Sequence, residues 1–155
     1  MEYKDKVAVV TGGAHGIGKC IAEEFRKNGA SVEVIDMRGG EHFVGAISMK
    51  EVLESYAAEV IGKYGKVDFI INNALPLMKG LDECTWEEFQ YALTVGVPAP
   101  FYLVKLLAPY LAERMCGQIQ RIEYKGAVHL FITVPGQDTA FARAVKDAIG
   151  FICNK

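Results

Sequence analysis

A glycine-rich turn between an apolar run and an amphipathic segment constrains this chain more than any other feature. Residues 7–10 (VAVV) form a continuous apolar run, which is typical of a strand buried on both faces of a parallel sheet. Residues 11–18 (TGGAHGIG) come next, and the helix predicted after them has Ile17, Ile21 and Phe25 on one face. This order predicts the first unit of a doubly wound α/β fold.

The glycines of this turn have distinct predicted tasks. Gly12 permits a tight turn, Gly16 lets the backbone approach a pyrophosphate, and Gly18 lets helix and strand pack closely. The N-terminus of the helix then presents free N–H groups and partial positive charge to phosphates. Asp36 ends the next strand, 31–36 (SVEVID), where a carboxylate can bind ribose hydroxyls and repel a 2′-phosphate. The expected ligand is therefore a dinucleotide, and NAD rather than NADP.

A short connection precedes the weak third strand that is predicted at residues 43–47 (FVGAI). Only about six residues, 37–42, separate it from the second strand, whereas a parallel crossover normally takes a dozen or more. We therefore expect this crossover to be a bare extended loop. The first helix is expected to end before it, at Asn28 and Gly29, a pair favoured at helix C-termini.

Two capping boxes predict the starts of the later helices. Ser48 with Glu51 opens one that closes near residues 63–65, and Thr85 with Glu88 opens a longer one. The residues expected to face inward from the first of these helices are Val52, Leu53, Tyr56 and Val60. A fourth strand is predicted between the two helices, at residues 67–72 (VDFIIN).

Two prolines interrupt the longer helix. Pro98 and Pro100 each remove an intrahelical hydrogen bond, which predicts a break near Gly96. We expect the helix to resume at Phe101 and to run to about Glu113.

The remaining residues, 113–155, predict a strand–strand–helix completion. The strands are expected at 118–124 (QIQRIEY) and 128–134 (VHLFITV), with a hairpin through residues 125–126 and a parallel arrangement both left open. The last helix, capped by Asp138 or Thr139, has apolar residues three and four positions apart. We therefore predict one domain over residues 1–155: a Rossmann-like, three-layer αβα fold with a mostly parallel sheet of five to six strands.

Composition excludes several classes of function. The chain is 51% apolar with a net charge of −2, so nucleic acid and anionic membranes are not expected as partners. No apolar run approaches the ~20 residues of a membrane span, and the charged start, 1–6 (MEYKDK), is unlike a secretory signal. The four cysteines are scattered without a C-x-x-C spacing, so neither a metal site nor disulfides are predicted. We expect a protein of the reducing cytoplasm.

The motifs at 11–18 (TG-x-x-x-GIG) and 72–74 (NNA) resemble those of the short-chain dehydrogenase/reductase family, with Leu75 in place of the family's glycine after the second motif. The likeness covers about residues 5–112. It implies a Rossmann fold that holds a nicotinamide dinucleotide, with Asn72 and Ala74 supporting the cofactor and the sheet. The predicted cofactor-binding residues are Gly12, Gly13, His15, Gly16, Ile17, Gly18, Asp36, Asn72 and Ala74.

The residues that this family uses for hydride-transfer chemistry are not recognisable. The family depends on a serine, a Tyr-x-x-x-Lys pair and a helix asparagine, yet none of the seven tyrosines has lysine four positions later. The serines all lie upstream of the expected position, and Gly96 stands in place of the asparagine. Ala46 replaces an aspartate that faces the adenine in many members, which should weaken cofactor binding. No catalytic residue is therefore predicted, and Tyr102 with Lys105 is interpreted as a pair on a helix surface.

Three functional hypotheses follow from these motifs and departures. The first is a domain, resembling a truncated, recombined or engineered family member, that binds NAD(H) without turnover. The second is a structural or engineered scaffold without a functional ligand, and the third is an active oxidoreductase with an unrecognised catalytic set. We also expect a homo-oligomer formed through the helix at 85–113, with Tyr102, Leu106 and Tyr110 exposed.

Overall fold

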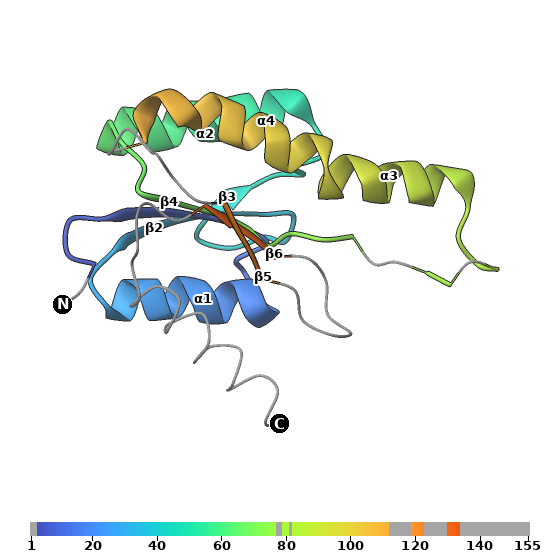
Figure 1. The fold of residues 1–155 in the computed structure, drawn as a ribbon, viewed down its shortest axis with the longest axis horizontal. Helices are drawn as coiled ribbons and strands as arrows, with labels where there is room; N and C mark the ends of the chain where they lie inside the picture. The colour runs from blue at the N-terminus through green and yellow to red at the C-terminus, as the bar shows by residue number, and fades with distance from the viewer. Residues whose placement is uncertain (1–2, 77–78, 81, 112–118, 123–129, 134–155) are drawn as a thin grey trace.

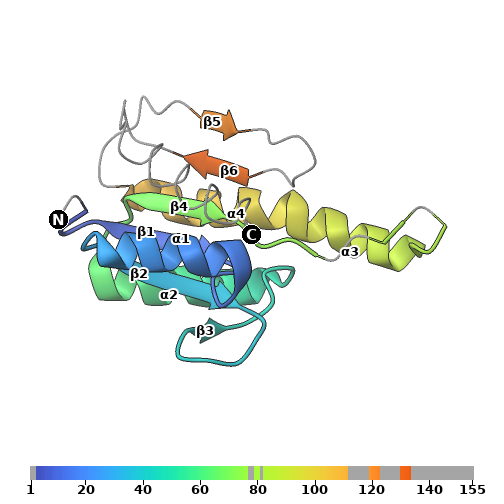
Figure 2. The same cartoon turned by 90° about the horizontal axis from the view of Figure 1, so that it is seen from below.

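The protein is a three-layer αβα sandwich in the computed structural model, which describes residues 3–76, 79–80, 82–111, 119–122 and 130–133. Helix α1 (Gly16–Lys27) covers one face of a six-stranded sheet, and α2 (Lys50–Tyr64) and α4 (Pro98–Leu107) cover the other (Figure 1). Helix α3 (Trp86–Gly96) projects beyond the edge of the sheet in both views (Figures 1 and 2). The predicted fold class is confirmed.

The sheet has the strand order β3-β2-β1-β4-β6-β5. Strands β1 to β4 run parallel, whereas β6 pairs antiparallel with β4 and with β5. The antiparallel pairing of β5 and β6 decides between the two arrangements left open for the tail, in favour of the hairpin. The strands are β1 (Val7–Thr11), β2 (Ser31–Asp36), β3 (Phe43–Val44), β4 (Phe69–Asn72), β5 (Ile119–Ile122) and β6 (Leu130–Thr133). The hairpin turn and the predicted last helix lie outside the described residues.

Burial on both faces of β1 explains its continuous apolar run. Ala8 and Val10 face α1, while Val9 faces α2 and α4, and all three are fully buried. Beneath α1, Tyr3, Phe25 and Phe69 form an aromatic cluster with ring centroids 5.1–5.6 Å apart. On the other face the largest fully buried side chains are Ile35, Leu53, Tyr56, Ile70, Leu103 and Leu107. Of the residues expected to face inward from α2, only Val52 is partly rather than fully buried.

The start of α1 differs from the predicted apolar face. Ile21 and Phe25 are buried, but Ile17 is 43% exposed. Ile17 lies in the first helical turn, and the inward position there belongs to the buried Gly18. At the other end, Asn28 caps the helix and Gly29 has a φ of +96°, which confirms the predicted C-terminus.

The β2–β3 crossover is a loop, as expected from its length. Six residues, 37–42, suffice because the parallel pairing is only two residues long, with Ile35 opposite Phe43 and Asp36 opposite Val44. The same brevity makes β3 shorter than the predicted strand at 43–47.

One of the two predicted capping boxes is wrong. Helix α2 begins at Lys50, its N-cap is Met49, and that residue makes no side-chain cap hydrogen bond. Burial of Ile47 fixes the preceding loop, and a turn from Ala46 to Met49 shifts the helix start beyond Ser48. The second box is present: the Thr85 hydroxyl accepts from the Glu88 amide at 3.2 Å, and the Thr85 amide donates to the Glu88 carboxylate at 3.0 Å.

The predicted helix break is confirmed, but the helix resumes earlier than expected. It restarts at Pro98 instead of Phe101, because proline is well tolerated in the first turn, where its missing N–H has no intrahelical partner. It ends at Leu107 and continues as a 3₁₀ turn, η1 (Ala108–Tyr110), instead of reaching Glu113.

The exposed apolar surface of α3 and α4 also differs from the prediction. Tyr102 and Leu106 are partly buried against the core, whereas Tyr110 is exposed. The exposed residues instead form what we call the α3–α4 stripe, whose members follow one another at intervals of three and four: Trp86, Phe89, Leu93, Val97 and Phe101.

The helical run that carries this stripe is long and apolar enough to cross a membrane by length and composition alone. This run, Trp86–Tyr110, contains an 18-residue window with a mean hydropathy of 1.4, and 28% of that window is buried. The expectation that no apolar run approaches the length of a membrane span does not hold for this run. Core helices of globular domains pass the same test, and Ala92, Leu103 and Leu107 are buried within the core here.

Candidate functional site

The turn between β1 and α1 is held by glycines that leave no room for side chains. A Cβ atom on Gly12 would lie 2.9 Å from the Ala74 Cα, and one on Gly18 would lie 2.3 Å from the Gly12 carbonyl oxygen. A Cβ on Gly13 would meet the Val34 side chain at 2.8 Å. Gly12 also has a φ of +66°, a conformation that side chains disfavour. The predicted roles of Gly12 in the tight turn and of Gly18 in close packing are confirmed.

Gly16 is the exception in this turn. Its φ is +56°, yet a Cβ atom there would meet nothing within 4 Å. The absence of a side chain at Gly16 therefore serves no packing need among the described residues. Without a side chain at Gly16, the backbone amides at the start of α1 stay accessible, and a bound phosphate would need to reach these amides.

Among the residues that the structure describes, none neutralises the start of α1 in the usual ways. Its N-cap, His15, makes no side-chain cap hydrogen bond, and its first turn holds no acidic residue. Helix α3, by contrast, has a complete capping box and two acidic residues in its first turn. The partial positive charge of α1 remains available to an anion, so the residues present fit the diphosphate of a dinucleotide.

Two residues that were not assigned to the site hold this turn in place. The Thr11 hydroxyl accepts hydrogen bonds from the Asn73 and Ala74 amides, each at 3.0 Å. The Asn73 side-chain amide donates to the carbonyls of Thr11 and Gly12, each at 3.1 Å. Thr11 and Asn73 stand within the two sequence motifs, and this position was the sequence signal that could have identified them. Together Thr11 and Asn73 clasp the end of β1 to the end of β4.

Asp36 lies where the sequence predicted, at the end of β2 beside the glycine turn. One carboxylate oxygen accepts from the Ala14 amide at 3.1 Å and the other from the Arg38 amide at 3.0 Å. Burial tends to raise the pKa of Asp36, but these hydrogen bonds and the nearby His15 and His42 outweigh it, so the pKa is lowered. The carboxylate is therefore a stable acceptor for a ribose hydroxyl.

The other predicted residues lie near this turn with different surroundings. The side chain of His15 is 51% exposed, with Nδ1 at 3.5 Å from the Asp36 carboxylate. Ala74 packs directly against Gly12. Asn72 is 9% exposed, and its Oδ1 is buried without a hydrogen-bond partner among the described residues. The fold thus brings the glycine turn together with Asp36, His15 and Ala74 at the C-terminal edge of the parallel strands.

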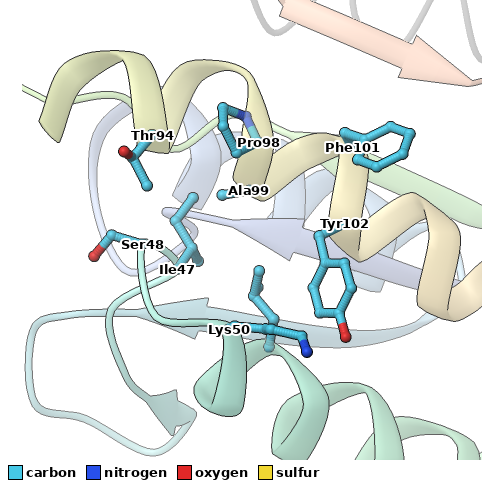
Figure 3. A pocket seen from close by; sticks show the side chains of 9 residues that line it. Ile47, Ser48, Lys50, Thr94, Pro98, Ala99, Phe101 and Tyr102 are labelled. Atoms are coloured by element: carbon cyan, nitrogen blue, oxygen red, sulfur yellow. The ribbon is translucent and has the colours of Figure 1, made fainter. Parts of the chain in front are cut away.

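A hollow of about 240 Å³ lies apart from the glycine turn, between α2 and the α3–α4 bend (Figure 3). It places a phenol beside an ammonium group, because the Lys50 Nζ lies 5.4 Å from the centre of the Tyr102 ring. The Tyr102 hydroxyl donates to Glu54, and this hydrogen bond, with burial and the charge of Glu54, raises the pKa of Tyr102. A catalytic phenol needs a lowered pKa. No residue of the glycine turn lines this hollow, so the two are separate.

The described residues hold no cluster of three or more His, Cys, Asp or Glu side chains that could bind a metal ion.

Comparison with known families decides the ancestry of the chain. Residues 6–129 match the family model of the short chain dehydrogenases. The chain belongs to this family. The match extends past residue 112, where the motifs alone suggested that the likeness ends, and so includes β5. This region carries no diagnostic motif, so the predicted end of the likeness at about residue 112 is too early.

Individual relatives agree with this assignment. The chain is 31% identical to L-fucose dehydrogenase of Oryctolagus cuniculus, over 92% of this chain and 57% of that protein. It is 37% identical to momilactone A synthase of Oryza sativa subsp. japonica, over 74% of this chain and 48% of that protein. The chain therefore spans about half the length of these curated relatives.

Solved structures share the fold. A metagenomic short-chain oxidoreductase in complex with NADP aligns with a TM-score of 0.64 at 26% identity, over 71% of this chain and 58% of that one. A 3-ketoacyl-(acyl-carrier-protein) reductase from Brucella melitensis, complexed with NADH, gives the same TM-score and identity over 70% of this chain and 51% of that one.

Proposed function

We propose that this chain binds NAD(H) at the turn between β1 and α1 and does not by itself transfer hydride. The observation that carries the proposal is the open backbone at Gly16, at a helix N-terminus without a side-chain cap, beside the Asp36 carboxylate. The diphosphate would lie against the first amides of α1, and the adenosine ribose would bind Asp36. Relatives solved with NADH and with NADP support a nicotinamide dinucleotide as the ligand class.

The proposed lack of turnover rests on the chemistry of the tyrosines. Hydride transfer to or from an alcohol needs a group that moves a proton at the substrate oxygen. No tyrosine of the chain has a lysine four residues later. In the described part of the chain, folding places Tyr102 near Lys50 and Tyr64 near Lys63, but the two hydroxyls donate hydrogen bonds to Glu54 and Glu33. Tyr102 also lines the hollow that is separate from the glycine turn.

Titration with NADH tests the proposal. Trp86 is the single tryptophan, and bound NADH accepts its fluorescence energy. We expect saturable quenching with a Kd below about 1 mM. The variant Asp36→Arg should lose this signal, because it removes the acceptor for the ribose hydroxyls. Titration with no quenching, or with equal quenching in the variant, would contradict the proposal and favour a scaffold without a ligand.

An active oxidoreductase remains the second candidate, favoured by the names of the relatives. The test is the rate at which the wild type oxidises a panel of alcohols with NAD, compared with the rate of Gly16→Trp, which blocks the proposed diphosphate position. A wild-type rate above that of the variant would support this second candidate. We expect no turnover above that level.

We also propose that two copies associate through the α3–α4 stripe. Its members are 44–68% exposed, a costly arrangement for large apolar side chains unless they are covered. An antiparallel pairing about Gly96 would place Glu87, in the acidic first turn of α3, against Lys105 near the end of α4. This charge complementarity favours a second copy of the chain as the occupant.

Light scattering tests the association. The wild type should be a dimer, and Leu93→Lys should be monomeric, because a buried unpaired charge opposes the contact. Glu59→Lys, an exposed change on α2, serves as the control and should stay dimeric. A monomeric wild type would contradict the proposal. Cytoplasmic location and the absence of nucleic-acid or membrane partners stay predictions from composition.

A further inference from the structure

The hollow between α2 and the α3–α4 bend has a mostly apolar lining (Figure 3). Three of its lining residues, Ile47, Leu53 and Ala99, are buried, whereas Phe101 is exposed. A water molecule in a cavity needs about two to four polar partners, and a lining of this kind supplies few of them. An apolar cavity of about 150 Å³ admits benzene. The hollow holds about 240 Å³, so it has room for one aromatic ring with a short substituent.

Two consecutive aromatic residues of α4, Phe101 and Tyr102, line the hollow. Pairs of aromatic rings gain stabilisation beyond the area that they bury. The Tyr102 side chain is held in place, because its hydroxyl donates to Glu54 and the Lys50 Nζ lies 5.4 Å from the centre of its ring. A side chain that is already ordered loses little freedom when a ligand binds. The lining therefore favours an aromatic ligand over an aliphatic one of the same size.

An ammonium group at the hollow has hydrogen-bond donors to spare. The Lys50 Nζ lies 3.4 Å from the Glu54 carboxylate, and a lysine has three N–H groups, so donors remain for a ligand. The Thr94 hydroxyl already donates to the Gln90 carbonyl at 2.9 Å. The Ser48 hydroxyl points away from Lys50 (Figure 3), and a neutral donor forms a weaker hydrogen bond than a charged one. Lys50 is therefore the donor expected to bind a ligand acceptor.

The charges beside the hollow offset each other. The hydrogen bond from Tyr102 lowers the pKa of Glu54, so this carboxylate stays ionised next to the Lys50 ammonium. An anionic ligand would be attracted by one of these groups and repelled by the other, and the same holds for a cationic ligand. A neutral molecule with one hydrogen-bond acceptor avoids this repulsion.

We propose that this hollow binds a neutral molecule with a single aromatic ring and a carbonyl group. The ring would lie against Leu53 and Phe101, and the carbonyl oxygen would accept a hydrogen bond from Lys50. The site is independent of the proposed dinucleotide site, since no residue of the glycine turn lines the hollow. Of the lining residues only Phe101 belongs to the α3–α4 stripe, so the proposed association leaves the rest of the lining in place.

Titration of the full chain with acetophenone tests the proposal, with the methyl NMR signals of Ile47, Leu53 and Ala99 as the readout. We expect these signals to shift saturably with a Kd on the order of 1 mM, in the range of ligands of this size. Ethylbenzene has nearly the same shape without the acceptor and serves as the matched ligand. Benzoate and benzylamine, which carry opposite charges, should bind more weakly than acetophenone.

The variant Lys50→Met keeps the length of the side chain and removes its donors. The Kd of acetophenone should rise about fivefold, whereas the Kd of ethylbenzene should not change. Lys27→Met is the control, because Lys27 is an exposed lysine on α1 that also pairs with a glutamate, Glu24, at 3.6 Å. Its two Kd values should equal those of the wild type. Ala99→Leu should abolish the binding of both ligands, because the larger side chain would occupy the hollow.

Three outcomes would overturn the proposal. The first is a titration in which the three methyl signals do not shift saturably. The second is an equal change of both Kd values in Lys50→Met, or no change in either, because Lys50 would then not bind the acceptor. The third is tighter binding of benzoate or benzylamine than of acetophenone, because the hollow would then select a charged ligand. No dinucleotide is present in these titrations, so their failure would leave the proposed function intact.

Discussion

Replacement of Gly18 by alanine is expected to abolish dinucleotide binding and to lower the free energy of unfolding by about 3 kcal/mol or more. The added Cβ would lie 2.3 Å from the Gly12 carbonyl oxygen and 2.4 Å from the Asn73 side-chain nitrogen. One of these atoms belongs to the backbone, so the turn has to move. The better helix propensity of alanine, about 1 kcal/mol, does not offset this cost. Urea denaturation followed by circular dichroism measures the loss.

Gly16→Ala is the matched control for this variant. A Cβ there meets nothing within 4 Å, and the cost is limited to the positive φ of +56°, about 1 kcal/mol. Its methyl group would nevertheless occupy space beside the proposed diphosphate, so NADH affinity should fall about tenfold, or 1.4 kcal/mol, with little loss of stability. Equal destabilisation by both variants would show that the turn does not pack as described.

Thr11→Val should produce the other large effect, a loss of about 3 kcal/mol in the free energy of unfolding. Thr11 is 1% exposed, and its hydroxyl accepts from the amides of Asn73 and Ala74. Valine has the same shape without an acceptor, so two amides lose their partner while the packing is kept. Because this clasp positions the glycine turn, NADH affinity should also fall.

Thr11→Ser separates the hydroxyl from the methyl group. Serine restores the acceptor and removes one methyl, so it should cost about 1 kcal/mol and retain NADH binding. If Thr11→Ser lowered the free energy of unfolding as much as Thr11→Val, the packing of the Thr11 methyl group would account for the loss, and the hydrogen bonds of the clasp would not.

The glycine turn and its neighbouring elements could be predicted from local sequence alone. Spacing alone predicted β1, the turn, α1 and the acidic end of β2, because these features follow from backbone sterics and hydrophobic periodicity over adjacent residues. The same reasoning found the capping box at Thr85 and the helix break before Pro98, which are also local. It failed at Ser48, where burial of Ile47 moved the start of α2.

Contacts between distant residues were decided only by the tertiary structure. The clasp of Thr11 by Asn73 joins residues 62 positions apart, and the Tyr102–Glu54 hydrogen bond joins residues 48 apart. The approach of His15 and His42 to Asp36 likewise depends on how α1 and the β2–β3 loop meet at the end of one strand. The sequence by itself determined the fold class and the place of the glycine-rich turn, since both depend on local patterns. Packing of the layers determined which side chains surround that turn and which apolar residues remain exposed on α3 and α4.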